Sequence, residues 1–188
     1  MDRLIVGISG ASGVLYGVRF LEIASKLPLQ IHLVISEAAK KNLKIETTYT
    51  AEDLSSMAHQ SYAPDDLSAP ISSGSFITHG MVIIPCSIKT LSGVANSYNN
   101  TLLIRAADVC LKERRKVILV VRETPLHLGH LRLMEHATEM GAVIFPPIPA
   151  FYHRPKTIED IIDQSIGKIL DQFGIEHHLF KRWGEKEK

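Results

Sequence analysis

"LIVGISGASGVLYGVRFLEIASKL", residues 4–27, decides which fold this chain of 188 residues adopts. The stretch begins with the apolar run 4–8, passes through a glycine-rich turn, and ends in residues 14–27, where apolar side chains recur with a helical period. A short run that is apolar on consecutive residues is typical of a strand buried on both faces. A helix directly after such a strand fits a crossover between parallel strands. The stretch therefore predicts the first strand and helix of a parallel α/β sheet.

The same pattern recurs along the rest of the chain. Further apolar runs lie at 31–35, 81–85, 117–121 and 142–146, and a second helical pattern lies at 101–115. Strands that alternate with helices indicate a sheet covered on both faces. We therefore predict an α/β fold, a three-layer Rossmann-like (flavodoxin-like) sandwich with a mostly parallel sheet, in a single domain of residues 1–188.

Two segments depart from this regular alternation. Residues 50–79 have the weakest periodicity and are rich in Ser, Pro and Asp, so we expect a partly irregular insertion there. Near the end, apolar residues from Ile158 to Leu170 follow helical spacing, and Thr157 or a neighbour is expected to start that helix. Residues 175–188 are expected to form a C-terminal tail.

Charge and cysteine content exclude several classes of function. The 21 Lys and Arg residues nearly balance the 20 Asp and Glu residues, so we expect no nucleic-acid and no membrane partner. The first residues lack the features of a secretory signal, and no apolar run approaches a membrane span, which predicts a cytoplasmic protein. The two cysteines, Cys86 and Cys110, have no CxxC spacing and are expected to be reduced thiols.

The glycine-rich turn is the first candidate binding element. Gly7, Gly10 and Gly13 lie between the first strand and the first helix, where small residues let a phosphate or a flavin ring approach helix N–H groups that we expect to be unpaired and to point outward. Ser12 is the side chain of this turn that can donate a hydrogen bond. The spacing matches neither the dinucleotide GxGxxG motif nor the GK[ST] of a P-loop. The alternative is that the glycines serve only a tight turn.

Polar residues follow two of the predicted strands. Ser36 ends the run 31–35, at the edge of the sheet where ligands of open α/β folds bind, although it could instead only cap a helix that starts at Glu37. Glu46 lies a few residues later in the chain. It is either an acid of the site or a solvated acid on the surface. In "PCSIKTL", residues 85–91, the side chains of Ser87, Lys89 and Thr90 suit a phosphate.

A cysteine lies inside the stretch 85–91. Cys86 would need a base to act as a nucleophile, and neither a histidine nor a known cysteine-enzyme signature lies nearby. We therefore interpret Cys86 as a packing residue beside a binding loop.

Charged residues gather in the second half of the chain. One face of the helix at 101–115 carries Arg105, Asp108 and Lys112. The two cations could bind an anion together, or all three residues could form a salt-bridge ladder. Arg122 and Glu123 directly follow an apolar run, which suits a phosphate clamp and a proton-handling acid.

Two histidines and the loop 146–155 are weaker indications of function. His127 and His130 are three residues apart without further ligands nearby, so we expect no metal site. The loop "PPIPAFYHRP", residues 146–155, presents Phe151 and Tyr152, and Lys168 lies in the helix after it.

Ordered motifs over nearly the whole chain resemble the flavin prenyltransferase family, the UbiX and Pad1-type proteins. These motifs are "GISGASGVLYG", "PCSIKTLSGVA", "NTLLIRAADVCLKERRKVILVVRETPL", "GAVIFPPIPAFYHRP" and "RWGE". The resemblance implies metal-independent transfer of a dimethylallyl group from dimethylallyl phosphate to reduced FMN, first to N5 and then to C6. It also implies that the product, prenylated FMN, serves a UbiD-type decarboxylase, and that the subunits form a homododecamer with sites at subunit contacts.

The resemblance also implies roles for individual residues. The residues expected to contact FMN are Gly10, Ala11, Ser12, Ser36, Ser87, Ile88, Lys89, Thr90 and Arg122. Tyr152 and Lys168 would hold the phosphate of the donor, and the remaining charged residues around it would be Arg105, Lys112 and Glu123. Ser12 and Glu46 would support flavin proton chemistry, and Trp183 would be the aromatic residue near the site. Many relatives carry arginine where this chain has Lys168. The lysine keeps the positive charge but cannot bind a phosphate through two parallel hydrogen bonds, as an arginine can.

Three other functions fit parts of the pattern. An FMN-dependent cysteine decarboxylase would share the fold and the flavin loops, but it would use an early histidine and another substrate clamp. A non-catalytic FMN-binding protein would have no need of Arg105, Lys112, Glu123 or Lys168. Direct decarboxylation of phenolic acids is not supported by these residues.

Overall fold

The computed structural model describes residues 2–184. The chain divides into two compact units, Met1–Pro146 and Pro147–Lys188. The single-domain organisation therefore stays a prediction. Among the residues that the structure describes, no helix is both long and apolar enough to cross a bilayer.

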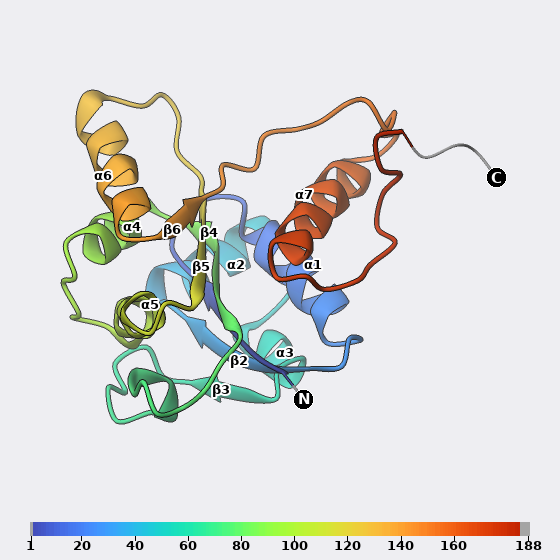
Figure 1. Ribbon diagram of the computed structural model, residues 1–188. Coiled ribbons are helices and arrows are strands. Elements are labelled where there is room, and N and C mark those ends of the chain that lie inside the picture. Colours follow the sequence, from blue (N-terminus) through green and yellow to red (C-terminus); the bar gives the residue numbers. More distant parts are fainter. Residues whose placement is uncertain (1, 185–188) are drawn as a thin grey trace. The chain divides into compact units, whose positions relative to one another are not determined.

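The first unit is built on one parallel sheet of six strands (Figure 1). In chain order these are β1 Asp2–Ile8, β2 Leu29–Ile35, β3 Gln60–Tyr62, β4 Gly80–Cys86, β5 Lys116–Val121 and β6 Ala142–Ile144. Their order across the sheet is β3-β2-β1-β4-β5-β6, and all neighbouring pairs are parallel. The predicted parallel α/β architecture is confirmed.

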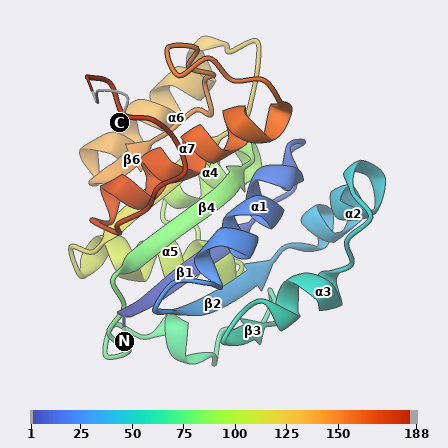
Figure 2. The same ribbon diagram turned by 90° about the vertical axis from the view of Figure 1, so that its right-hand side faces the viewer.

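Helices cover both faces of this sheet. They are α1 Val14–Ala24, α2 Glu37–Glu46, α3 Ala51–Ser56, α4 Ile88–Ala95, α5 Leu102–Lys112 and α6 Leu128–Glu139. Figures 1 and 2 show α1 and α2 on one face of the sheet and α4 and α5 on the other. Every residue of β4 is buried, which explains why this central strand is apolar on consecutive residues.

The segment 50–79 holds more regular structure than its sequence indicates. It contains α3, the edge strand β3 and a short 3₁₀ helix at Pro70–Ser72. A strand of three residues is too short to show a period, and β3 exists because its backbone pairs with β2. Three predicted elements are also shorter than expected, since α1 ends at Ala24, α5 spans Leu102–Lys112 and β6 ends at Ile144.

In the second unit, residues 147–184 contain one helix, α7 Ile158–Gln172. Thr157 is its N-cap, as predicted, and forms a capping box with Asp160. Beyond the helix, Arg182 donates two hydrogen bonds of 2.9 and 2.7 Å to the carboxylate of Asp171. This bidentate pair joins the predicted tail to α7. Residues 185–188 of that tail lie outside the described residues.

Candidate functional site

A pocket opens where β1 and β4 lie side by side. From β1 the chain passes over one face of the sheet to β2, and from β4 it passes over the other face to β5, so the segments after these strands diverge. In open α/β sheets, ligands bind at this kind of switch point. The pocket has a volume of about 520 Å³ and is lined by Gly10, Ser36, Glu37, Ala38, Pro64, Asp65, Ser87, Lys89, Thr90, Asn100, Thr101, Leu103 and Ile104.

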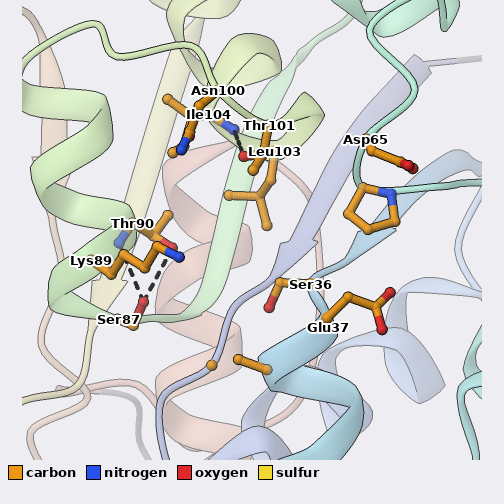
Figure 3. Close-up of a pocket in the computed structure, with 13 residues that line it drawn as sticks. Ser36, Glu37, Asp65, Ser87, Lys89, Thr90, Asn100, Thr101, Leu103 and Ile104 are labelled. Carbon is orange, nitrogen blue, oxygen red and sulfur yellow. Dashed lines mark hydrogen bonds between the residues drawn. The ribbon is translucent and has the colours of Figure 1, made fainter.

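One wall of the pocket is the start of α4 (Figure 3). Ser87 is the N-cap of α4, and its Oγ accepts a hydrogen bond of 3.3 Å from the N–H of Thr90. The Ser87 hydroxyl also donates to Thr90 Oγ1 at 3.1 Å. With Lys89 beside them, two hydroxyls, an ammonium group and the amino end of a helix face one space. The structure thus gathers the three residues of the "PCSIKTL" stretch for which a phosphate contact was predicted.

The opposite wall is formed by the start of α2 and the glycine-rich turn. Ser36 is the N-cap of α2 and accepts a hydrogen bond of 3.1 Å from the N–H of Ala39, and it lines the pocket as well. Ser36 therefore caps α2 and also lies at the pocket, while its contact with a ligand stays a prediction. A Cβ atom on Gly10 would lie 2.3 Å from Cβ of Ala38, so only glycine allows the turn to approach α2 this closely.

The amino end of α1 differs from the sequence-based expectation. The N–H groups of Gly13 and Val14 are not unpaired, because both donate to Oε2 of Glu46, at 2.8 and 3.0 Å. Glu46, the last residue of α2, therefore caps α1 with a carboxylate. An anionic ligand meets negative charge at this end of α1 and positive charge at the start of α4.

Arg122 and Glu123 follow β5 on the same edge of the sheet. The N–H of Arg122 donates to the carbonyl of Cys86 at 3.1 Å, and a Cβ atom on Gly13 would lie 3.9 Å from Cγ of Arg122. Arg122 therefore lies beside the glycine-rich turn. The carboxylate of Glu123 is exposed and accepts a hydrogen bond of 3.0 Å from the N–H of Thr124.

The two predicted cations of α5 do not line this pocket. Arg105 donates to the carbonyl of Ser72 at 3.2 Å and to Asp108 at 3.0 Å, and Lys112 pairs with Glu113 at the end of α5. Only the first turn of α5 reaches the pocket. For Arg105 the salt-bridge interpretation is correct within one chain.

The second unit brings two predicted residues together. The rings of Tyr152 and Trp183 meet edge to face, with 5.6 Å between their centroids. Both line a cavity of about 290 Å³, together with His153, Arg154, Lys181, Arg182 and Gly184. Lys168 is exposed on α7 and does not line this cavity.

The cysteines and histidines add no reactive centre to these pockets. Cys86 is fully buried, and burial raises the pKa of its thiol, which argues against a nucleophile. Burial also raises the pKa of the Cys110 thiol, to about 11. Within residues 2–184, no group of three or more His, Cys, Asp or Glu residues could hold a metal ion. The rings of His127 and His130 lie against each other with centroids 3.6 Å apart and planes tilted by 34°.

Sequence reasoning missed several residues that line the larger pocket. Thr101 is the N-cap of α5, and a threonine directly before a helical pattern is a signal that could have been used. Pro64 and Asp65 follow β3, which no periodicity revealed. Their place depends on how the edge strand pairs.

Comparisons with known proteins agree with this geometry. A family model described as Flavoprotein matches residues 1–171. A curated relative from Thauera aromatica, named Flavin prenyltransferase UbiX, is 58% identical over 185 residues, which is 98% of this chain and 95% of the relative. The chain belongs to the UbiX flavin prenyltransferase family.

Solved structures with UbiX names share the fold over nearly the whole chain. AnUbiX (PadA1), solved in complex with FMN and dimethylallyl pyrophosphate, has a TM-score of 0.96 at 44% identity and covers 99% of both chains. A dodecameric FMN-dependent UbiX-like protein from Escherichia coli O157:H7 has a TM-score of 0.95 at 47% identity, over 97% of this chain and 100% of that chain. The cysteine decarboxylase TvaF has a TM-score of 0.64 at 15% identity, which shows a common fold alone.

Proposed function

We propose that this protein is a flavin prenyltransferase that joins the dimethylallyl group of dimethylallyl phosphate to N5 and C6 of reduced FMN. The observation that carries the proposal is the pocket at the switch point, with the amino end of α4, two hydroxyls and Lys89 on one wall, in a chain of the UbiX family. The pocket suits the phosphate of a flavin mononucleotide, because it offers charge-assisted donors.

The residues of the pocket fit FMN. The cavity of about 520 Å³ has the size of a small-molecule site, and Gly10 contributes no side chain to its wall. We assign Ser87, Lys89 and Thr90 to the phosphate. Gly10, Ala11, Ser12, Ser36, Ile88 and Arg122 are the other proposed FMN contacts.

Reduced FMN, when bound, supplies the nucleophilic ring atoms N5 and C6. Breaking the allyl C–O bond leaves positive character on carbon and negative charge on phosphate, so the protein must stabilise the leaving phosphate and exclude water. We assign this task to Tyr152 and Lys168, with Trp183 as an aromatic shelter for the allyl group. Glu123 is proposed to relay a proton through the released phosphate, and Ser12 and Glu46 are proposed to support the proton chemistry of the flavin.

Arg105 and Lys112 have a proposed role only in an assembly. Both cations lie away from the pocket of their own chain, and the UbiX-like structure from E. coli O157:H7 is dodecameric. We propose that this protein also forms a homododecamer, in which Arg105 and Lys112 face the donor phosphate at a neighbouring subunit's site.

The receiving partner follows from the proposed product. Prenylated FMN would be used by a UbiD-type decarboxylase, which we propose as the recipient. The cytoplasmic location and the independence from metal ions stay predictions.

The decisive experiment is anaerobic incubation of the purified protein with reduced FMN and dimethylallyl phosphate, or its diphosphate, followed by mass spectrometry of the small molecules. We expect a flavin that has gained one C5H8 unit. Unchanged flavin that is still bound would contradict the proposal and favour a flavin carrier or a cysteine decarboxylase, which a peptidyl-cysteine substrate would then distinguish. A Glu123→Gln protein with an undiminished rate would refute the proton-transfer role of Glu123.

A further inference from the structure

Ser9 directly follows β1 and is completely buried. Its hydroxyl donates to the carbonyl of Pro85 at 2.9 Å and accepts the N–H of Ser87 at 2.7 Å. Its own N–H donates to the same Pro85 carbonyl at 3.2 Å. One side chain at the end of β1 therefore holds the last residues of β4 and the first residue of the loop after it.

The regular sheet does not hold this part of β4 as firmly. The pairing of β4 with β5 shifts register between Ile83 and Cys86, and Pro85 has no N–H to donate to a neighbouring strand. The β4 backbone is therefore irregular around Ile84 and Pro85, and its pairing with β5 resumes at Cys86, directly before Ser87, the N-cap of α4. Hydrogen bonds from Ser9 join Pro85 and Ser87, the residues on either side of Cys86, to the end of β1.

We propose that Ser9 is a positioning residue that sets the affinity of the pocket for the phosphate end of the flavin. It acts through Ser87, because the hydrogen bond to the Ser87 N–H fixes where the hydroxyl of that residue and the first turn of α4 lie. This inference rests on the proposed function, in which Ser87, Lys89 and Thr90 bind the FMN phosphate. Ser9 itself does not line the pocket.

The matched control is Ser165, a buried serine of α7. It is 1% exposed, and its hydroxyl donates to the carbonyl of Ile161 at 3.3 Å, within its own helix. Both Ser9→Ala and Ser165→Ala delete a buried hydroxyl, so both are expected to lower the melting temperature. Only Ser9→Ala removes a bond to a pocket loop.

The test measures the dissociation constants of FMN and of riboflavin, which lacks the phosphate, for the wild type and both variants. We expect Ser9→Ala to weaken FMN binding about tenfold and to leave riboflavin binding within about twofold, the loss expected for one buried hydrogen bond that acts on the phosphate alone. Ser165→Ala should leave both constants unchanged. Equal losses for the two flavins, or unchanged FMN binding in Ser9→Ala, would overturn the inference.

A double-mutant cycle tests the route through Ser87. If Ser9 acts through that residue, Ser9→Ala should cost less FMN affinity in a Ser87→Ala background than in the wild type. Fully additive losses would show that the route is wrong. If Ser9→Ala does not fold, Ser9→Cys, which retains a weaker hydrogen-bonding group, gives the same comparison. Wild-type protein that binds no FMN would instead contradict the proposed function itself.

Discussion

The carboxylate of Glu46 accepts a hydrogen bond of 2.8 Å from the N–H of Gly13, 33 residues earlier in the chain. Gly13 is the N-cap of α1 and has a φ of 89°, a left-handed conformation that glycine adopts without strain. Its side chain is a hydrogen atom and cannot cap the helix, so an acid from the end of α2 provides the cap. Because of this contact, the amino end of α1 repels an anion, whereas the amino end of α4 attracts one.

Replacing Glu46 tests this cap. Glu46→Gln should lower the free energy of unfolding by about 1 kcal/mol, because a neutral amide interacts less favourably with the amino end of a helix. Denaturant titration measures this change. The control is Glu159→Gln, which neutralises an acid in the first turn of α7, where Thr157 already provides the cap. If Glu46→Gln is as stable as the wild type, the cap contributes nothing.

Lys89 should contribute to binding through its charge. We expect Lys89→Met to weaken FMN binding about tenfold and to reduce the dependence of that binding on salt, because one charge-assisted contact with the phosphate is lost. Riboflavin binding should not change. Isothermal titration at two salt concentrations measures both effects, with Lys44→Met on α2 as the control. A loss that is the same for riboflavin would place Lys89 at another part of the ligand.

Trp183 offers a direct signal of donor binding. It is the only tryptophan of the chain, and its ring touches the ring of Tyr152 in a shared cavity. Addition of dimethylallyl phosphate should change Trp183 fluorescence in a saturable manner. Tyr152→Phe should raise the KM for the donor about tenfold and leave FMN affinity unchanged, because it removes one hydroxyl from the phosphate contact. Unaltered fluorescence at saturating donor would argue against this location of the donor.

His32 should make the fold sensitive to acid. Burial, together with the nearby charges of His59 and Arg3, lowers the pKa of His32 from 6.5 to about 4, while Nδ1 lies 2.8 Å from the hydroxyl of Tyr62. The unfolded chain therefore binds a proton that the folded chain excludes between these two pH values. The free energy of unfolding should fall as the pH is lowered from about 6.5 towards 4.

The measurement is denaturant unfolding at several pH values in that window. Protonation of carboxylates with a lowered pKa, such as those of Glu22 and Asp171, also destabilises the fold in acid. The variant must therefore be compared with the wild type. His32→Gln should have a shallower slope, whereas His136→Gln, at an exposed position of α6, should keep the wild-type slope. Identical slopes for His32→Gln and the wild type would rule out His32 as the source.

Much of the fold can be predicted from the sequence, because each long strand is a run of consecutive apolar residues. The runs at 4–8 and 81–85 are apolar on consecutive residues, and the structure buries these strands as that pattern predicts. The segment 50–79 gave no such signal, since the three residues of β3 form a strand only by pairing with β2.

The candidate site was readable only in part. Ser36 and Ser87 were found because each directly follows an apolar run, and strand ends of a parallel sheet meet at one edge. The partner of Gly13 could not be found in this manner, because Glu46 reaches it only after α2 folds back beside α1.

By itself, the sequence determined the long strands, the helical patterns at 14–27, 101–115 and 158–170, and the family. Burial on both faces and helical periodicity leave local patterns, and the family motifs occur in order. Only the tertiary structure decided which charges face the pocket. Lys89 was placed there, Arg105 was paired with Asp108, and Glu46 was directed to the amino end of α1. The physical reason is that electrostatic and hydrogen-bond partners are chosen by distance in space, which is fixed only when the elements pack.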